Sequence, residues 1–166
     1  VIKGQPENMP MLQALLDQGC QLIDYEKVTD DQGRRSIFFG HHAGLAGMVD
    51  TLWALGRRLS DEGVVNPFTD LKQMVKYDGL EEAKAAISTA GKRIAQDGLP
   101  ESITPFICGF AGYGNVFGGA NEIVELLPVE EIEPDQVSEV ARHSDARHVV
   151  YKVVFREHHM VEPVSP

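Results

Sequence analysis

The sequence predicts an α/β fold, in which strands alternate with helices along the chain. An apolar run at 106–111 leads directly into a glycine-rich turn and then into a helical pattern over about 115–127. A further strand is expected at 129–132, and a run rich in β-branched residues at 149–155 predicts a third. Strands separated by helices are typical of a parallel sheet with right-handed crossovers. We therefore expect this part of the chain to open a doubly wound sheet.

The glycine-rich turn has the spacing Gly-x-Gly-x-x-x-Gly, formed by Gly112, Gly114 and Gly118. In a nucleotide-binding turn the glycines allow a sharp bend, close approach of the backbone to a pyrophosphate and tight helix packing. The N–H groups at the start of the following helix would point at the phosphates. Phe117 stands where the third glycine usually falls, so the spacing is one residue longer than the common pattern. The turn predicts a dinucleotide site, with a glycine-rich connection that binds no ligand as the alternative.

Two acidic residues follow the turn where a dinucleotide site usually places the acid that binds the ribose hydroxyls. Glu131 and Glu133 lie about 20 residues beyond the glycines, near the end of the second expected strand, and Glu133 is the better placed. A carboxylate in that position repels a 2′-phosphate, so Glu133 favours NAD over NADP. A solvated strand end is the alternative interpretation, since acidic residues are common at surfaces.

The first forty residues predict a helix with strands on either side. Residues 1–3 resemble the end of a strand, and Asn8 is a candidate N-cap for a helix that ends at Gly19. Gln21–Glu26 and Ser36–Phe39 are two apolar runs separated by a polar turn. We expect the first run to be a strand and the two runs to form a hairpin.

Two helices are expected between these segments and the glycine turn, over about 43–59 and 80–96. The first carries small residues in its opening turns, Gly44 and Gly47 among them, although an interior glycine costs about 1 kcal/mol relative to alanine. Such residues let another backbone come close. They predict a tight helix crossing, within the chain or in a homo-oligomer, with ordinary close packing as the alternative.

Composition limits the class of partner. The chain has 25 acidic and 15 basic side chains and a formal net charge of −10, which argues against nucleic acid or an anionic membrane as a partner. No apolar run approaches the ~20 residues of a membrane span, and no signal peptide is evident. Cys20 and Cys108 lie in apolar, strand-like contexts, which favours packed free thiols in a reducing compartment. A cytoplasmic location is expected.

Histidine and serine provide no recognisable site of their own. Adjacent histidines, such as His41 with His42 and His158 with His159, point in different directions on a helix or a strand and rarely share a metal ion. No Cys/His/Asp spacing suggests zinc, and the Gly-x-Ser-x-Gly elbow of a serine nucleophile is absent from the sequence. We expect no metal and structural or surface roles for the histidines.

Five segments together resemble a known family. They occur in the family's order and are Lys3–Pro10, Leu22–Glu26, Gly33–Arg35, Phe39–Met48 and Gly112–Val116. The sequence is similar to the lysine–2-oxoglutarate reductase and saccharopine dehydrogenase group, within the alanine dehydrogenase and transhydrogenase-like fold. The similarity runs from Val1 to about Val161 and is closest to the saccharopine-forming reductase part.

The resemblance implies part of a two-domain, Rossmann-like dehydrogenase with a helical connector between the domains. It implies that 1–42 ends the substrate domain, that 43–104 is the connector and that 105–166 is the first half of the dinucleotide-binding domain. Such enzymes join the lysine ε-amine to the 2-oxoglutarate ketone as an imine, which hydride reduces to saccharopine. The family's acid–base lysine and histidine are expected upstream of Val1, so this chain is not expected to catalyse alone.

The resemblance also implies roles for individual positions. Substrate contacts are implied for Gln5, Arg35 and Phe39, with Lys3 as an electrostatic partner in the cleft. The planar fork of Arg35 suits a substrate carboxylate. For a cofactor, NAD or NADP, the implied residues are Arg34, Gly112, Gly114, Asn115, Val116, Gly118 and Glu133. An alanine dehydrogenase-like enzyme and a non-catalytic dinucleotide-binding module are the alternative functions.

Overall fold

The structure is a computed structural model that describes residues 5–162 and residue 164. The predicted strand end at 1–3, and with it the candidate substrate residue Lys3, lie outside the described residues. The chain divides into two compact units, 1–38 and 39–166, each of which is described by itself. None of the described helices has both the length and the apolar character to cross a membrane.

The first unit contains the predicted helix. A short 3-10 turn at Pro6–Asn8 leads into α1, Met9–Asp17, and the chain then leaves the helix through Gly19, whose φ is +59°. Glycine is the residue that adopts this left-handed region most readily, and the predicted end of the helix is confirmed. All residues of α1 keep contact with solvent, because none of them is buried.

The predicted strand at Gln21–Glu26 is wrong. The segment is irregular and ends in a 3-10 turn, Tyr25–Lys27, in which the side chain of Asp24 accepts a hydrogen bond from the N–H of Glu26. Leu22 and Ile23 are 67% and 81% exposed, since no strand among the described residues pairs with them. A strand pattern becomes a strand only where a neighbour takes up its hydrogen bonds and covers its apolar face.

The expected hairpin is reduced to one antiparallel bridge, between Thr29 and Arg35. One further backbone hydrogen bond extends it, from the N–H of Ser36 to the carbonyl oxygen of Val28 at 2.9 Å. Cys20, predicted to be packed, is exposed, while Cys108 in the second unit is partly buried, and both are free thiols. Burial raises the pKa of the Cys108 thiol to about 11.

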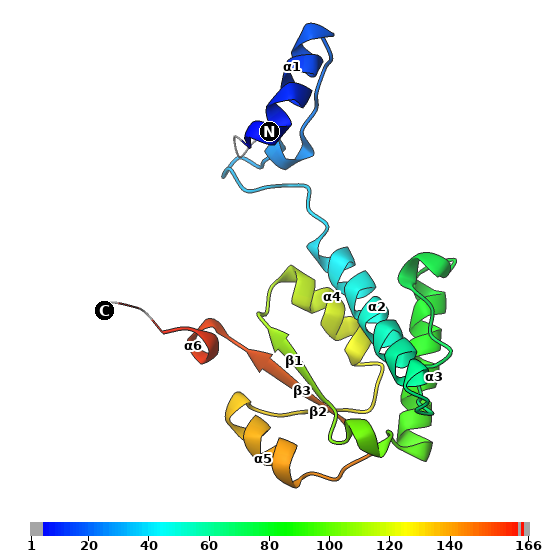
Figure 1. The fold of residues 1–166 in the computed structure, drawn as a ribbon. Coiled ribbons are helices and arrows are strands. Elements are labelled where there is room, and N and C mark those ends of the chain that lie inside the picture. The colour runs from blue at the N-terminus through cyan, green and yellow to red at the C-terminus, as the bar shows by residue number, and fades with distance from the viewer. Residues whose placement is uncertain (1–4, 163, 165–166) are drawn as a thin grey trace. The chain divides into compact units, whose positions relative to one another are not determined.

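The second unit is an α/β arrangement, which confirms the predicted fold class at that level (Figure 1). Its sheet has three parallel strands in the order β1-β3-β2. Its elements follow in the order α2 (Gly40–Asp61), α3 (Leu80–Asp97), β1 (Ile107–Ala111), α4 (Asn115–Val124), β2 (Val129–Glu131), α5 (Val137–His143), β3 (Val150–Phe155) and α6 (Glu157–Met160). These bounds confirm the helices and strands predicted from position 43 onward.

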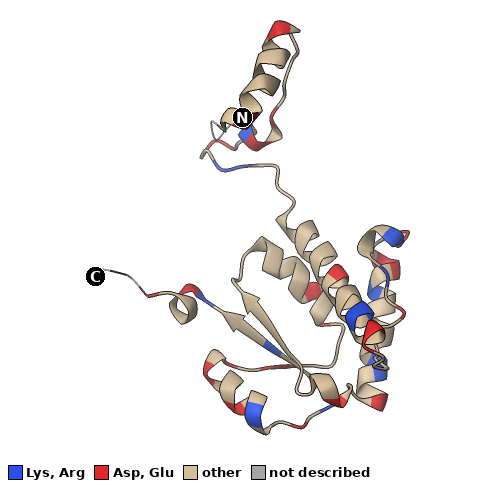
Figure 2. Cartoon of the chain, in the orientation of Figure 1, with Lys and Arg blue, Asp and Glu red and all other residues tan. Residues whose placement is uncertain are grey.

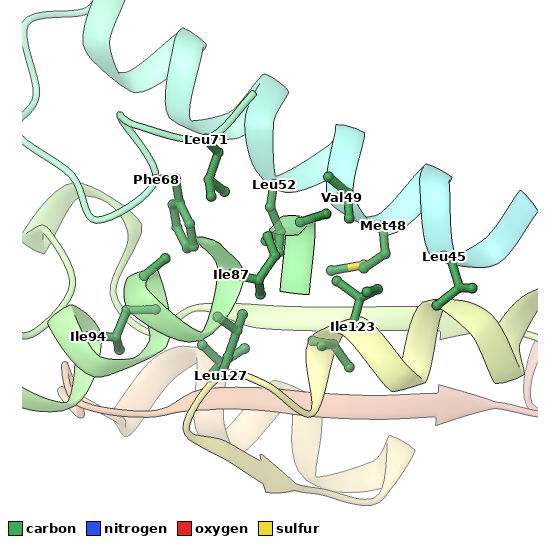
Figure 3. Packing of buried hydrophobic residues seen from close by; sticks show 14 of the residues in the cluster. Leu45, Met48, Val49, Leu52, Phe68, Leu71, Ile87, Ile94, Ile123 and Leu127 are labelled. Carbon is green, nitrogen blue, oxygen red and sulfur yellow. The ribbon is translucent and has the colours of Figure 1, made fainter. Parts of the chain in front are cut away.

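Helices cover both faces of the sheet. In Figure 1, α2 and α4 lie over one face and α5 lies beneath the other. Alternate residues of β3 pack on opposite faces of the sheet. Val150 lies in the core under α2, α3 and α4, whereas Tyr151 and Val153 pack with α5. Figure 3 shows the larger core, in which Met48 of α2 points toward Ile123 of α4. This two-sided burial is typical of parallel sheets.

The tight helix crossing expected from the small residues of α2 lies within the chain, between α2 and α4. A Cβ atom on Gly44 would overlap the carbonyl oxygen of Val116, and one on Gly119 would overlap the carbonyl oxygen of His41. The two helices therefore touch through their backbones. Gly47, which the sequence grouped with Gly44, has no atom within 4 Å of the position of a Cβ.

Candidate cofactor-binding crevice

The glycine turn joins β1 to α4 and lies at the carboxyl end of the sheet. Gly112 has a φ of +109°, a region open to glycine alone, and Gly114 is the residue before the first helical position of α4. The N–H of Gly112 donates to the carbonyl oxygen of Phe155 at 2.9 Å, which fixes the turn to the end of β3. A Cβ on Gly112 or Gly114 would meet no atom within 4 Å, so the space beside the turn is open to a ligand.

Phe117, the residue out of place in the glycine spacing, packs against the strand. Its ring makes an edge-on contact with the ring of Phe110, with 5.2 Å between centroids. In a nucleotide-binding turn the third glycine lets the helix pack closely. Here Gly119 does this, and it was not among the predicted residues. A cavity of about 200 Å³ adjoins the turn and is lined by Phe110, Ala111, Gly112, Gly114, Val116, Phe117 and Ala120.

A second cavity, of about 350 Å³, lies across the carboxyl ends of the three strands. The turn contributes Tyr113 and Phe117, α4 contributes Asn121, and β2 with its following residues contributes Glu131, Ile132 and Glu133. β3 and the residues after it contribute Lys152, Val154, Arg156 and His159. Open α/β sheets bind ligands at the carboxyl ends of their strands, so this crevice stands where a nucleotide is expected.

Lys152 is a charged side chain in the middle of the central strand. Its side chain is 7% exposed, and its Nζ reaches Glu125 Oε1 at 2.5 Å, Glu131 Oε2 at 2.9 Å and Asn121 Oδ1 at 3.0 Å. Burial opposes the charged form, but the hydrogen bonds to Glu125 and Glu131 outweigh it and raise the pKa of Lys152. The sequence reasoning missed this residue, whose only signal is a lone lysine inside the apolar run 149–155.

The turn also contacts the segment that follows β3. The hydroxyl of Tyr113 donates to Glu157 Oε2 at 3.2 Å, and the guanidinium carbon of Arg156 lies 5.4 Å from the centre of the Tyr113 ring. The N–H of Arg156 donates to His159 Nδ1 at 3.0 Å, so this ring nitrogen is an acceptor. These residues were not selected from the sequence either, because the contacts of Tyr113 with Arg156 and Glu157 join parts of the chain more than 40 residues apart.

The predicted cofactor residues of the second unit gather around the two cavities. Gly112, Gly114 and Val116 line the smaller one, and Glu133 lines the larger one. Asn115 begins α4, and Gly118 lies in the first turn of that helix. The turn and Glu133 are thus on one edge of the sheet. They are separated by β3, which lies between β1 and β2.

The remaining predicted residues belong to the first unit, apart from Phe39, which begins the second. In the first unit, Gln5 accepts a hydrogen bond from Asn8 at 2.9 Å, and Arg34 Nε donates to Asp30 Oδ2 at 2.8 Å. The backbone N–H and the guanidinium of Arg34 lower the pKa of Asp30. Arg35 lies 3.3 Å from Glu26 Oε1, with both side chains about half exposed.

Phe39, the fourth candidate substrate residue, precedes α2 and is exposed. One histidine makes a structural contact between helices. His41 of α2 lies 3.2 Å from Glu122 of α4, and the same carboxylate accepts from Lys84 of α3 at 2.6 Å. Across the described ranges, no group of three or more His, Cys, Asp or Glu side chains is arranged to hold a metal ion.

The parallel three-stranded sheet and its helices form an α/β segment, which is compatible with part of a Rossmann-like domain. No family model matches the sequence. The chain is 41% identical over 160 residues to alpha-aminoadipic semialdehyde synthase, mitochondrial, of Rattus norvegicus, and 40% identical over 160 residues to that of Bos taurus. It is 44% identical over 138 residues to alpha-aminoadipic semialdehyde synthase of Arabidopsis thaliana.

These similarities cover 96% of this chain for the two mammalian proteins and 83% for the plant protein. The chain spans 17% of the length of the mammalian relatives and 13% of the plant one. The resemblance stated from the motifs is therefore confirmed: the chain is homologous to a segment of alpha-aminoadipic semialdehyde synthases, the lysine–2-oxoglutarate reductase and saccharopine dehydrogenase family.

The expected cytoplasmic location is wrong on the same comparison. The relatives from rat, mouse and cattle are named as mitochondrial proteins. Free cysteines indicate a reducing compartment, and net charge indicates which partners are unfavourable. Neither property distinguishes one reducing compartment from another.

Proposed function

We propose that this chain is the segment of an NAD(P)-dependent oxidoreductase that holds the cofactor turn and part of the substrate wall. The reaction acts on the C–N bond of an amino acid and forms or cleaves saccharopine from lysine and 2-oxoglutarate. The observation that carries the proposal is the 40–44% identity to alpha-aminoadipic semialdehyde synthases over 83–96% of the chain.

We propose that the cofactor binds at the edge of the sheet where the three strands end. Gly112, Gly114, Asn115 and Val116 lie where the backbone would receive a pyrophosphate, with the N-terminal N–H groups of α4 behind it. The open space beside the two glycines supports that fit. The nicotinamide group, when bound, supplies or accepts the hydride. Gly118 and Glu133 complete the proposed cofactor residues of this unit, and Arg34 is proposed to reach the cofactor from the first unit.

We propose substrate contacts for residues of the first unit and for Phe39, the residue that follows it. Arg35 is proposed to bind a substrate carboxylate, Gln5 and Phe39 to contact the substrate, and Lys3 to supply positive charge. We propose the two-domain arrangement with its boundaries at 42 and 104. The exposed apolar side chains of the first unit support this, since such surfaces are usually covered by another part of a protein.

The function is tested on the full-length protein that contains this segment, by following NAD(P)H oxidation. We expect turnover with lysine plus 2-oxoglutarate and none with ammonia plus pyruvate. Turnover with the second pair alone would assign an alanine dehydrogenase-like activity instead. Coenzyme binding without turnover of either pair would assign a non-catalytic dinucleotide-binding module.

Arg35→Ala is expected to raise the KM for 2-oxoglutarate about 10- to 100-fold, because a charge-assisted hydrogen bond to a carboxylate contributes about 1.5–3 kcal/mol. Steady-state kinetics with saturating lysine and coenzyme measure the change. Arg57→Ala is the matched control, since Arg57 lies on α2 and pairs only loosely, at 3.5 Å, with Asp61. An unchanged KM for both substrates in the Arg35 variant would remove Arg35 from the site.

A further inference from the structure

The larger cavity lies beside an acidic stretch of the chain. Residues 122–139 contain seven acidic side chains and no lysine, arginine or histidine, and two of these acids, Glu131 and Glu133, line the cavity. The ligand proposed for this crevice carries a negatively charged pyrophosphate, which unpaired carboxylates repel. Binding of that anion therefore requires positive charge at the same edge of the sheet.

Lys152 supplies positive charge from inside the sheet. It is the only lysine or arginine among the residues that form the three strands (Figure 2). Its strand, β3, lies between the other two. The Nζ atom reaches Glu131 Oε2 on β2 at 2.9 Å and Oε1 of Glu125, the residue directly after α4, at 2.5 Å. One ammonium group thus pairs with two carboxylates of the acidic stretch.

We propose that Lys152 masks the negative charge of Glu125 and Glu131, so that the crevice accepts the pyrophosphate of a dinucleotide. The inference rests on the proposed cofactor function and names a residue that lets an anion bind there. Lys152 does not need to touch the ligand, because the field of a charge extends over several ångströms and is strongest inside a cleft. The effect is the same for NADH and NADPH, since both contain the pyrophosphate.

The contacts of Lys152 favour this masking role over direct binding of a phosphate. Its side chain is 7% exposed, and its three N–H donors have three acceptors, the two carboxylates and Asn121 Oδ1 at 3.0 Å. The side chains of Glu125 and Glu131, by contrast, are 46% and 64% exposed, and Glu131 lines the cavity. Their charge would therefore act on a ligand if the ammonium were removed.

The other charged residues of the cavity do not replace Lys152. Glu133 and Arg156 also line the cavity, and their formal charges cancel. Without the ammonium of Lys152, the carboxylates of Glu125 and Glu131 would have no matching positive charge at this edge. The net charge beside the crevice would become more negative by one unit.

The test measures equilibrium binding of NADH and NADPH to the full-length protein by fluorescence titration at two salt concentrations. In about 10 mM salt, where charges act over about 30 Å, Lys152→Met should weaken both coenzymes about 3- to 10-fold. In about 1 M salt, where that distance falls to about 3 Å, the variant should bind within about twofold of the unmodified protein. Lys92→Met removes the same charge from an exposed position of α3, outside the cavity, and should leave both affinities unchanged.

A second comparison separates the charge of Lys152 from its packing. Adding Glu131→Gln to Lys152→Met restores the original net charge and should recover most of the affinity lost at low salt. Glu131→Gln alone changes an exposed side chain and should tighten the binding of both coenzymes at low salt. Adenosine, which carries no charge, should compete with NADH equally well in the unmodified protein and in Lys152→Met.

The remaining outcomes separate this inference from the proposed function. A loss of affinity that is equal at low and high salt, or that Glu131→Gln does not recover, would show that Lys152 only supports the fold. That result overturns the inference, as does unchanged binding in Lys152→Met at low salt or no tightening in Glu131→Gln. In each of these cases the cofactor function stands. If the unmodified protein binds neither coenzyme, the proposed cofactor function itself is refuted.

Discussion

Gly119→Ala should destabilise the packing of α4 on α2 by about 3 kcal/mol, at the upper end of what overpacking a close contact costs. The added Cβ would overlap the carbonyl oxygen of His41, which is backbone and has no rotamer to change. The helices must move apart, and Leu45 and Ile123 would lose contacts in the core that they share. Gly44→Ala should have a similar effect from the opposite helix, through Val116.

Hydrogen–deuterium exchange in the full-length protein measures this effect locally, where a single melting temperature would average over the whole molecule. Amides of α2 and α4 should exchange faster in Gly119→Ala. Gly47→Ala is the control, because Gly47 lies on α2, like Gly44, but has open space around it, and the variant should be neutral or more stable by about 0.5–1 kcal/mol. Unchanged protection of α4 in Gly119→Ala would contradict the backbone contact.

The position of the cofactor turn depends on this crossing. α4 begins at Asn115, directly after the turn, and a Cβ on Gly40 would come within 3.2 Å of the Asn115 side chain. α2 therefore supports the first turn of α4 from one side, while β3 fixes Gly112 from the other. A substitution that separates the helices should weaken dinucleotide binding without touching the ligand, since the helix N-terminus that is proposed to face the phosphates would move with α4.

Local patterns in the sequence identified most helices and strands correctly. The helix at 115–127 and the strand at 149–155 have strong periodicity or β-branched content, and such signals need no knowledge of the partner. The strand expected at 21–26 failed for the opposite reason. Its apolar residues satisfy the pattern, but a strand also needs a neighbour, and none of the described residues supplies one.

Only those parts of the candidate site that are formed by residues close together in the sequence could be predicted. The turn from Gly112 to Gly118 and the acid at Glu133 are visible as spacings, and the structure places them on one edge of the sheet. The order of the strands depends on pairing between segments that are far apart in the sequence. The spacing of residues therefore could not predict that Arg156 lies beside the turn. Likewise, Gly119 rather than Gly118 meets the backbone of α2, a difference that depends on how α4 is rotated about its axis.

Lys152→Ala should destabilise the second unit by about 2–4 kcal/mol, because it removes a buried aliphatic stem together with its ion pairs. Lys152→Met keeps most of the stem and removes the charge, so a smaller loss of about 1–3 kcal/mol is expected. The side chains of Glu125 and Glu131 are 46% and 64% exposed and can be hydrated once the ammonium is gone, which limits the cost of leaving them unpaired. Lys92→Met, at an exposed position of α3, is the control and should change stability by less than about 0.5 kcal/mol.

The charge of Lys152 also predicts how this contribution varies with pH. Its pKa is raised in the folded protein, so the ion pairs stabilise the fold fully below the ordinary lysine pKa of 10.5 and are lost as the pH rises through the folded value. The difference in exchange protection of β3 between the unmodified protein and Lys152→Met should be constant at neutral pH and should shrink above about pH 10.5. A difference that grows with alkaline pH would show that Lys152 is not held in its charged form by Glu125 and Glu131.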